Sequence, residues 1–254
     1  MKFSFQLYSA RNFQPWSEVL SSLSDLGYRQ VEGFGGVYEN PASIKAMMDD
    51  NNLSMPSGHF DIAALENDFA KVDEIAGIFG ISKIVCPFLQ PGSRPETADG
   101  WRDLARRLSA VSDTVSTSGR SFAWHNHDFE FEATPDGHIP MQVLLDDAPT
   151  IEWEADLAWI VRGGSDPFAW IEKYGDRISA VHVKDIAVEG DCMDEDGWAD
   201  VGQGTMQWHR LFDAVRNRSR CELFVAEHDN PNDLNRFAGR SIEAMRSFWE
   251  LANV

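Results

Sequence analysis

The chain has 254 residues, of which 41 are acidic and 22 are basic, so its formal net charge is −19. Proteins that bind nucleic acids usually present basic groups to the phosphates, so this charge argues against a nucleic-acid partner. No run of about 18 apolar residues predicts a membrane span, and the N-terminal segment lacks the long apolar stretch of a secretory signal. Three scattered cysteines without a Cys-x-x-Cys pair predict reduced thiols and a cytoplasmic protein.

Short apolar runs alternate with amphipathic stretches along the whole chain. The runs that predict β-strands are residues 3–8, 30–34, 53–60, 83–89, 121–126, 151–156, 178–185 and 221–227. Between them, Leu, Val and Ile recur at helical spacing, as in residues 15–27 and 99–119, and these stretches end near a glycine. Eight βα units of about 32 residues each predict an α/β fold, a closed (β/α)8 TIM barrel that forms a single domain over residues 1–254. An open, doubly wound sheet is the alternative, but no Gly-x-Gly-x-x-Gly follows the first strand.

Side chains that can bind metals or transfer protons recur where the predicted strands end. In a (β/α)8 barrel the C-terminal ends of the strands carry the chemistry, whereas the strand interiors are apolar. Scattered surface residues would not align at the same end of so many strands, so this pattern predicts an active site. The residues are Glu32, His59, His125, His127, Asp156, His182 and Glu227.

The carboxylates among these residues favour a bound cation. Strand alternation places Glu152, Glu154 and Asp156 on one face of their strand. A carboxylate inside a barrel costs free energy unless it is paired or bound to a cation, so we expect one divalent ion. Carboxylate and imidazole ligands suit Mn²⁺, Mg²⁺, Co²⁺ or Zn²⁺. Only Cys86 lies near a strand end, which argues against a thiolate zinc site.

Several of these residues have a plain structural alternative. His59 could bind substrate, or it could only cap its strand or bond a loop carbonyl. Glu32 could pair with a neighbouring lysine or arginine. His127 could orient another group by a hydrogen bond instead of contacting a ligand.

Five segments, "WHNHDFEF", "WEADLAW", "VHVKD", "VGQGTMQW" and "VAEHD", resemble in their order and spacing the xylose-isomerase-like barrel superfamily. That superfamily includes sugar isomerases, ketose 3-epimerases, inosose dehydratases and apurinic endonucleases, and the resemblance covers nearly the whole chain. It implies one divalent metal held by residues of strands five to eight, which correspond here to His125, Asp156, His182 and Glu227. The ketose epimerases have a glutamate at the first of these positions, whereas inosose dehydratases have a similar histidine-rich segment. Trp159 stands where many relatives have a substrate-binding histidine.

The expected chemistry is proton abstraction next to a carbonyl. A divalent ion that binds a carbonyl and the adjacent hydroxyl acidifies the C–H bond between them, and a nearby base then removes the proton. The candidate bases are Glu154, Glu227, His127 and Glu130. Lys184 could hold a substrate oxygen, or it could pair with Asp185 or Glu154. We therefore expect a metal-dependent sugar isomerase or epimerase; the alternatives are a dehydratase or lyase, an apurinic-type endonuclease and a non-catalytic sugar-binding barrel.

Aromatic residues near the strand ends are candidates for stacking on a sugar, or for packing under loops. They are Phe34, Phe60, Phe88 and Trp124, and His59, Glu130 and Trp159 complete the expected substrate contacts. The acidic loop of residues 185–204 would repel a phosphate, while its "VGQG" turn could offer backbone N–H groups to one or be only a tight turn. We expect a neutral sugar, keto-sugar or cyclitol as substrate, no nucleic acid or membrane as partner, and leave self-association open.

Overall fold

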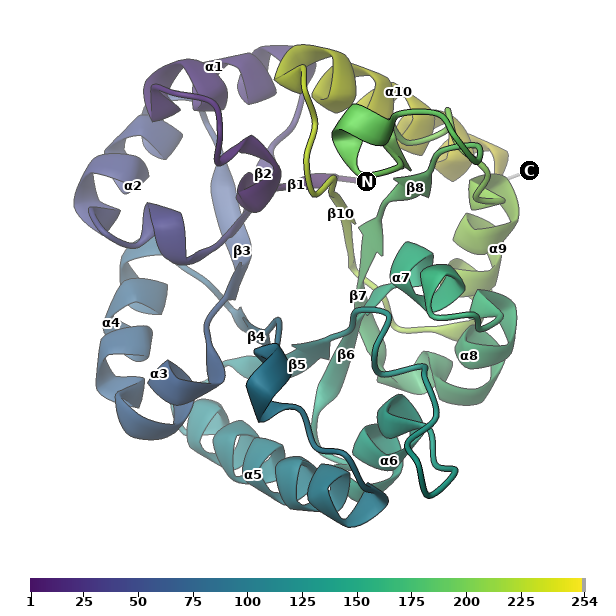
Figure 1. The fold of residues 1–254 in the computed structure, drawn as a ribbon. Helices are drawn as coiled ribbons and strands as arrows, with labels where there is room; N and C mark the ends of the chain where they lie inside the picture. The colour runs from purple at the N-terminus through teal and green to yellow at the C-terminus, as the bar shows by residue number, and fades with distance from the viewer. Residues whose placement is uncertain (253–254) are drawn as a thin grey trace.

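A computed structural model describes residues 1–252, which form a closed barrel of eight parallel strands inside a ring of helices (Figure 1). Because β1 pairs with both β2 and β10, the sheet has no free edge. The predicted (β/α)8 barrel is confirmed. The strands, in their order around the barrel, are β1 (Ser4–Gln6), β10 (Leu223–Ala226), β7 (Ile178–Val183), β6 (Glu152–Asp156), β5 (Ser121–His125), β4 (Lys83–Cys86), β3 (Ser54–His59) and β2 (Gln30–Gly33).

At least one helix connects each strand to the next and covers the outside of the barrel (Figure 1). The predicted helices 15–27 and 99–119 correspond to α1 and α5. The residue that caps the C-terminus of α1 is Gly27, whose φ of 100° suits glycine. Within residues 1–252, every helix is too short or too polar to cross a lipid bilayer. The helices are α1 (Trp16–Leu26), α2 (Pro41–Asp50), α3 (Ile62–Asn67), α4 (Phe69–Phe79), α5 (Ala98–Ser116), α6 (Pro140–Asp147), α7 (Leu157–Arg162), α8 (Pro167–Tyr174), α9 (Trp208–Arg218) and α10 (Leu234–Leu251).

Three of the predicted strands end two or three residues earlier than expected, and one of them is the fourth, which ends at Cys86. The first ends at Gln6, because its side chain accepts a hydrogen bond from the Tyr8 N–H at 3.0 Å and starts the 3-10 helix Leu7–Ala10. The seventh ends at Val183. The chain then forms β8 (Asp185–Ile186), which pairs antiparallel with β9 (Trp198–Ala199) in a separate two-stranded sheet.

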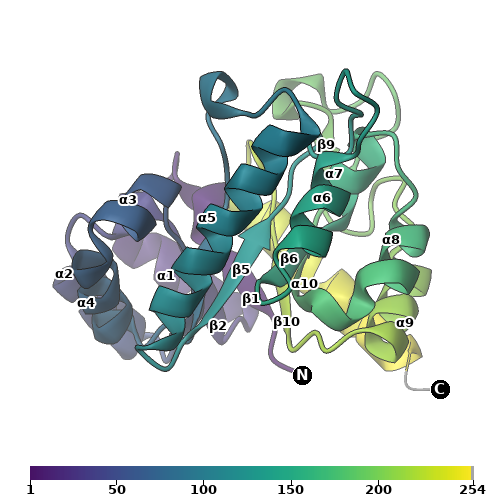
Figure 2. The same ribbon diagram turned by 90° about the horizontal axis from the view of Figure 1, so that it is seen from below.

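The interior of the barrel is apolar in the middle and polar at both ends. Ala180, Leu223 and Val225 form a small apolar cluster of their own. At the N-terminal end of the strands, Lys83 and Glu152 form an ion pair. The loops after the C-terminal ends of the strands lie at one end of the barrel, and the N-terminus lies at the other (Figure 2). The remaining polar side chains therefore gather at the loop end, where the chemistry of such barrels takes place.

Candidate active site

Four of the expected ligands meet at the C-terminal end of the barrel. One ligand atom from each lies within 4.8 Å of the other three, and all four side chains are buried. The register of the strands explains this, because Asp156 and Val225 both stand beside His182 on neighbouring strands, and the next inward residue after Val225 is Glu227. We call these four residues the outer set: His125, Asp156, His182 and Glu227.

Unpaired atoms in the outer set fit a bound cation. Asp156 Oδ1 accepts the backbone N–H groups of Ala158 and Trp159, both at 2.9 Å, and so caps α7. Asp156 Oδ2 and His125 Nδ1 are buried and have no hydrogen-bond partner among the described residues. Buried polar atoms are nearly always bonded, so two unpaired donor atoms among four metal-binding side chains are what a cation site requires.

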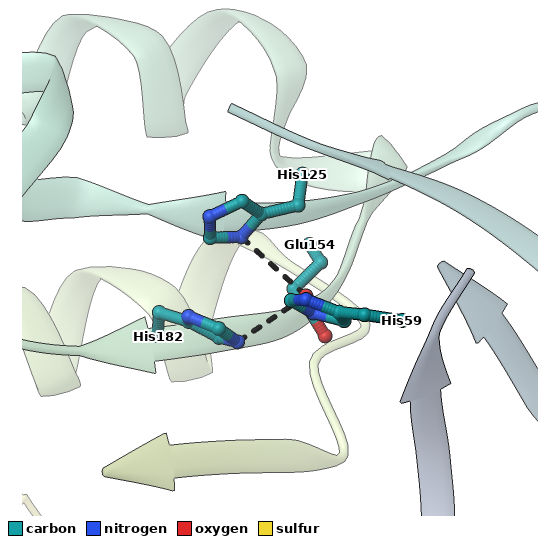
Figure 3. A group of neighbouring side chains, drawn as sticks. All are labelled: His59, His125, Glu154 and His182. Carbon is teal, nitrogen blue, oxygen red and sulfur yellow. Dashed lines mark hydrogen bonds and ion pairs between the residues drawn. The ribbon is translucent and has the colours of Figure 1, made fainter. Parts of the chain in front are cut away.

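A second group of ligand atoms, equally close together, lies beside the first. Figure 3 shows three imidazoles around one carboxylate. Glu154 Oε2 is 2.7 Å from His59 Nε2, 3.2 Å from His182 Nε2 and 3.4 Å from His125 Nδ1. We call this the inner set: His59, His125, Glu154 and His182. Since His59 bonds a buried carboxylate, it does not merely cap its strand.

Glu32 is fully buried against the inner set. It accepts hydrogen bonds from Gln6 Nε2 at 2.7 Å and from Ser57 Oγ. Its Oε1 also lies 2.7 Å from His182 Nε2 and 3.2 Å from His59 Nε2. Pairing with a lysine or arginine, which the sequence allowed, is wrong: the partners among the described residues are an amide, a hydroxyl and two imidazoles.

Burial and neighbouring charges set the protonation of this region. Burial and the charge of His182 lower the pKa of His125 to about 4, which keeps its imidazole neutral and able to bind a metal. Burial raises the pKa of Asp156 to about 7 against the attraction of Lys184. For His59, burial alone would lower the pKa, but two adjacent carboxylates raise it to about 9.

Lys184 is fully buried among acidic side chains. Its Nζ lies 2.7 Å from Asp229 Oδ2, 3.3 Å from Glu227 Oε2 and 3.8 Å from Asp156 Oδ2. Although burial lowers it, these carboxylates raise the pKa of Lys184 above its ordinary value. The partners suggested by the sequence, Asp185 and Glu154, are not its partners. Asp229 was not predicted, although strand alternation from Glu227 could have indicated it.

Four aromatic rings lie beside the outer set, and we call them the rim: Phe88, His127, Trp159 and Trp198. The His127 ring lies 5.0 Å from the Phe88 ring and 5.3 Å from the Trp159 ring. Trp159 also lies 4.9 Å from Lys184 Nζ, and Trp198 lies 4.3 Å from the same atom. His127 Nδ1 has no hydrogen-bond partner among the described residues. Three residues that the sequence placed at the active site, His127, Trp159 and Lys184, thus lie against one another beside the outer set.

Three expected substrate contacts are packed inside the protein instead. Trp124 is fully buried and donates from its indole N–H to Glu130, which is also fully buried and accepts the His127 backbone N–H. Phe60 is buried and stacks on Tyr38 with ring centres 4.6 Å apart. None of these side chains offers a surface to a ligand, so the substrate contacts expected of them are not supported. Strand alternation already pointed Trp124 away from His125.

Phe34 lies near the mouth of the barrel, after β2. Its ring is partly exposed and contacts Tyr8 at 5.5 Å and Trp16 at 6.2 Å. This position is compatible with the substrate contact expected of it, which stays a prediction.

The "VGQG" turn of residues 201–204 bonds a side chain of the protein. The Gly202 and Met206 N–H groups donate to the Asp185 carboxylate at 2.9 and 3.0 Å. A Cβ at Gly204 would lie 2.3 Å from Asp185 Oδ1, so only glycine allows this close approach. The N–H groups that the sequence offered to a phosphate are therefore occupied by a carboxylate.

Asn126 holds the end of β5 to the end of β6. Its Oδ1 accepts the Trp153 indole N–H at 2.8 Å and the Asp156 backbone N–H at 3.0 Å, and its Nδ2 donates to the Asp156 carbonyl at 3.0 Å. Asn126 thereby fixes the position of Asp156.

We expect Asn126→Ala to destabilise the fold by about 2–4 kcal/mol, because two buried N–H groups lose their acceptor. Urea unfolding measures this change. The matched control is Asn217→Ala on the exposed face of α9, which should cost less than about 0.5 kcal/mol. Equal, small effects of the two substitutions would contradict the role of Asn126.

The chain belongs to the xylose isomerase-like TIM barrel family, whose pattern matches residues 20–248. It is similar to an inosose dehydratase of Geobacillus kaustophilus (strain HTA426), with 24% identity over 192 residues. That alignment covers 66% of this chain and 61% of the relative, so the chain spans less than two thirds of the relative's length.

Two solved structures show the same fold at low sequence identity. One is a sugar phosphate isomerase/epimerase from Parabacteroides distasonis, with a TM-score of 0.81 and 21% identity over 97% of this chain and 93% of that one. The other is an IOLI protein with a bound zinc atom, with a TM-score of 0.76 and 13% identity over 100% of this chain and 98% of that one.

Proposed function

We propose that the protein is a divalent-metal-dependent sugar isomerase or epimerase, which removes a proton from the carbon next to the carbonyl of a keto-sugar or related polyol. The outer set carries this proposal, because four side chains that can bind a metal converge there and two of their buried atoms have no hydrogen-bond partner among the described residues. The family, and the isomerase/epimerase and dehydratase to which the chain is similar, support an enzyme acting on sugars or cyclitols.

The outer set suits the metal better than the inner set does. The closest contacts in and around the inner set are hydrogen bonds of 2.7 Å, which bind His59 to Glu154 and His182 to Glu32. In the outer set, Asp156 Oδ2 accepts no hydrogen bond from the described residues, and the set lies next to the rim. A divalent ion held there would polarise a substrate carbonyl and the adjacent hydroxyl. Its carboxylate and imidazole ligands fit Mn²⁺, Mg²⁺, Co²⁺ or Zn²⁺, and the zinc in the similar IOLI structure supports this assignment.

Among the candidate bases, the surroundings favour His127. Its Nδ1 has no hydrogen-bond partner among the described residues, and burial lowers its pKa well below the usual range, so its imidazole is neutral. Glu154 is less available, because its Oε2 lies 2.7 to 3.4 Å from three imidazoles. Glu227 belongs to the outer set and also contacts Lys184. The Lys184 ammonium is positioned to donate to a substrate oxygen on which negative charge develops.

An uncharged substrate fits the site better than a sugar phosphate. The Gly202 N–H in the 201–204 turn and the Met206 N–H just after it already bind Asp185, while the Val201 and Gln203 N–H groups bond Ser241 and Asp200. The buried Lys184 ammonium faces three carboxylates at 2.7 to 3.8 Å, so its surroundings are negative and disfavour a phosphate anion. We therefore propose a neutral keto-sugar or cyclitol.

The test is proton exchange in D₂O. The metal-loaded protein is incubated with ketoses, 3-keto-glycosides and inososes, and the products are analysed by NMR. Deuterium at the carbon next to the carbonyl of a recovered or epimerised sugar supports the proposal. An unsaturated product supports the alternative, a dehydratase or lyase, which the similarity to an inosose dehydratase favours. No exchange with any metal or substrate would contradict both.

We expect Lys184→Met to lower kcat by roughly 10²–10³-fold, since it removes the donor aimed at the developing charge. Metal content should not fall, because the substitution removes a positive charge from beside the outer set. The control is Lys71→Met on the exposed face of α4, which should leave kcat unchanged. Steady-state kinetics together with elemental analysis check both; a Lys184→Met protein with wild-type kcat would contradict this role.

A further inference from the structure

Glu32 is a buried carboxylate whose polar neighbours include Gln6, Ser57, His59 and His182. It comes from β2, and its neighbours Gln6 and Ser57 come from β1 and β3, on either side of it in the barrel. Gln6 Nε2 donates to Oε1 at 2.7 Å, and Ser57 Oγ donates to Oε2. The two bonds fix both oxygens of the carboxylate. Glu32 is therefore a rigid acceptor, with Oε1 directed at His182 Nε2 at 2.7 Å.

His182 presents its two ring nitrogens to different sides of the barrel. Nε2 faces Glu32, and Nδ1 faces Glu227 Oε2 at 2.9 Å, on the side of the outer set. An imidazole that binds a metal is neutral and carries its one proton on the other ring nitrogen. Because both oxygens of Glu32 accept hydrogen bonds, the proton that faces Glu32 belongs to Nε2. The lone pair of the neutral ring is then on Nδ1.

We infer that Glu32 is a positioning residue, which holds the proton of His182 on Nε2 and so directs Nδ1 at the metal of the outer set. This inference rests on the proposed function. Among the described residues, the hydrogen-bond and ion-pair partners of Glu32 are Gln6, Ser57, His59 and His182. Carboxylates that bond the far nitrogen of a metal-binding histidine typically change metal affinity by about 10–100-fold when they are removed.

His59 keeps this arrangement together. Its Nε2 lies 2.7 Å from Glu154 Oε2 and 3.2 Å from Glu32 Oε1. One imidazole thus lies between two buried carboxylates that would otherwise repel each other. The inner set is then the support of the outer set and does not bind a second ion.

The test compares two substitutions at one position. Glu32→Leu removes the acceptor, whereas Glu32→Gln keeps a carbonyl oxygen that can accept from His182 and loses only the charge. We expect the affinity for Co²⁺, measured by titration of its visible absorption, to fall about 10–100-fold in Glu32→Leu and to recover substantially in Glu32→Gln. Glu152→Gln is the control, since Glu152 is a partly buried carboxylate at the other end of the barrel, in an ion pair with Lys83. Its Co²⁺ affinity should equal that of the wild type.

A second measurement separates positioning from a general loss of stability. In the Zn²⁺-loaded wild type, ¹⁵N-detected NMR of the histidine rings should show a proton on Nε2 of His182 and the metal on Nδ1. Wild-type affinity in Glu32→Leu, or an equal loss in the Glu152→Gln control, would overturn the inference. A metal on Nε2 would also overturn it, because the inner set would then hold the ion. If the wild type itself binds no divalent metal, the proposed function fails and this inference fails with it.

Discussion

Asp156→Ala and His182→Ala should each weaken metal binding by more than about a hundredfold. Both remove a donor of the outer set, and the loss of a ligand costs more than the loss of a supporting residue, which is about 10–100-fold. Asp156 Oδ2 is buried and accepts no hydrogen bond from the described residues, although Lys184 Nζ lies 3.8 Å away. In the proposed site, His182 contributes Nδ1, which lies 2.9 Å from Glu227 Oε2.

The measurement is metal per chain by elemental analysis, after loading with Mn²⁺ or Zn²⁺ and gel filtration. Asp99→Ala and His138→Ala are matched controls, because the first side chain is 91% exposed and the second 48% exposed. They should retain the wild-type content. Circular dichroism reports whether the Asp156→Ala variant keeps its fold, since this substitution also removes the cap of α7. If both ligand variants keep the full metal content, the outer set does not hold the metal.

The sequence predicted the strands, and it predicted that polar residues lie at their C-terminal ends. Both predictions were possible because period-2 alternation and short apolar runs are local properties of the sequence. His125 is the last residue of β5 and Asp156 the last of β6, as the pattern indicated. The resemblance to relatives then singled out one residue on each of four adjacent strands, and the structure brings these side chains together.

The partners across the barrel could not be predicted, because they depend on register and on irregularities that the sequence does not express. The register shifts between Gln30 and Glu32 where β2 pairs with β3, and again between Trp153 and Glu154 where β6 pairs with β7. These shifts bring Glu32 and Glu154 to the histidines of the inner set. An isolated strand pattern shows that such a carboxylate points inward but not which side chain it meets.

Trp124 and Glu130 show the opposite case, in which a local rule was available. Adjacent residues on a strand point to opposite faces, so an inward His125 implies an outward Trp124. Glu130 then bonds the Trp124 indole N–H, and burial raises the pKa of the Glu130 carboxyl to about 8. This pair helps to fix the segment that carries His127.

The segment "FAWHNHDFEF" supplies the last prediction. His125→Ala should lose metal and turnover together, whereas His127→Ala should keep the wild-type metal content and lose kcat by roughly 10²–10⁴-fold. The difference follows from position. His125 belongs to both the outer and the inner set. His127 lies at the rim against Phe88 and Trp159, and its Nδ1 has no hydrogen-bond partner among the described residues.

The two variants are compared by elemental analysis and by the D₂O exchange reaction, so that metal and chemistry are measured separately. A His127→Gln variant is a third member of the series, since glutamine can hold a substrate hydroxyl but cannot accept the proton. It should restore substrate affinity without kcat if His127 is the base. If the His127→Ala protein binds no metal and the His125→Ala protein keeps its full metal content, the roles assigned to the two histidines are wrong. Because a nitrogen of His125 lies with the ligand atoms of the outer set, while His127 contacts Phe88 and Trp159, we propose His125 as the metal ligand and His127 as the residue that meets the substrate.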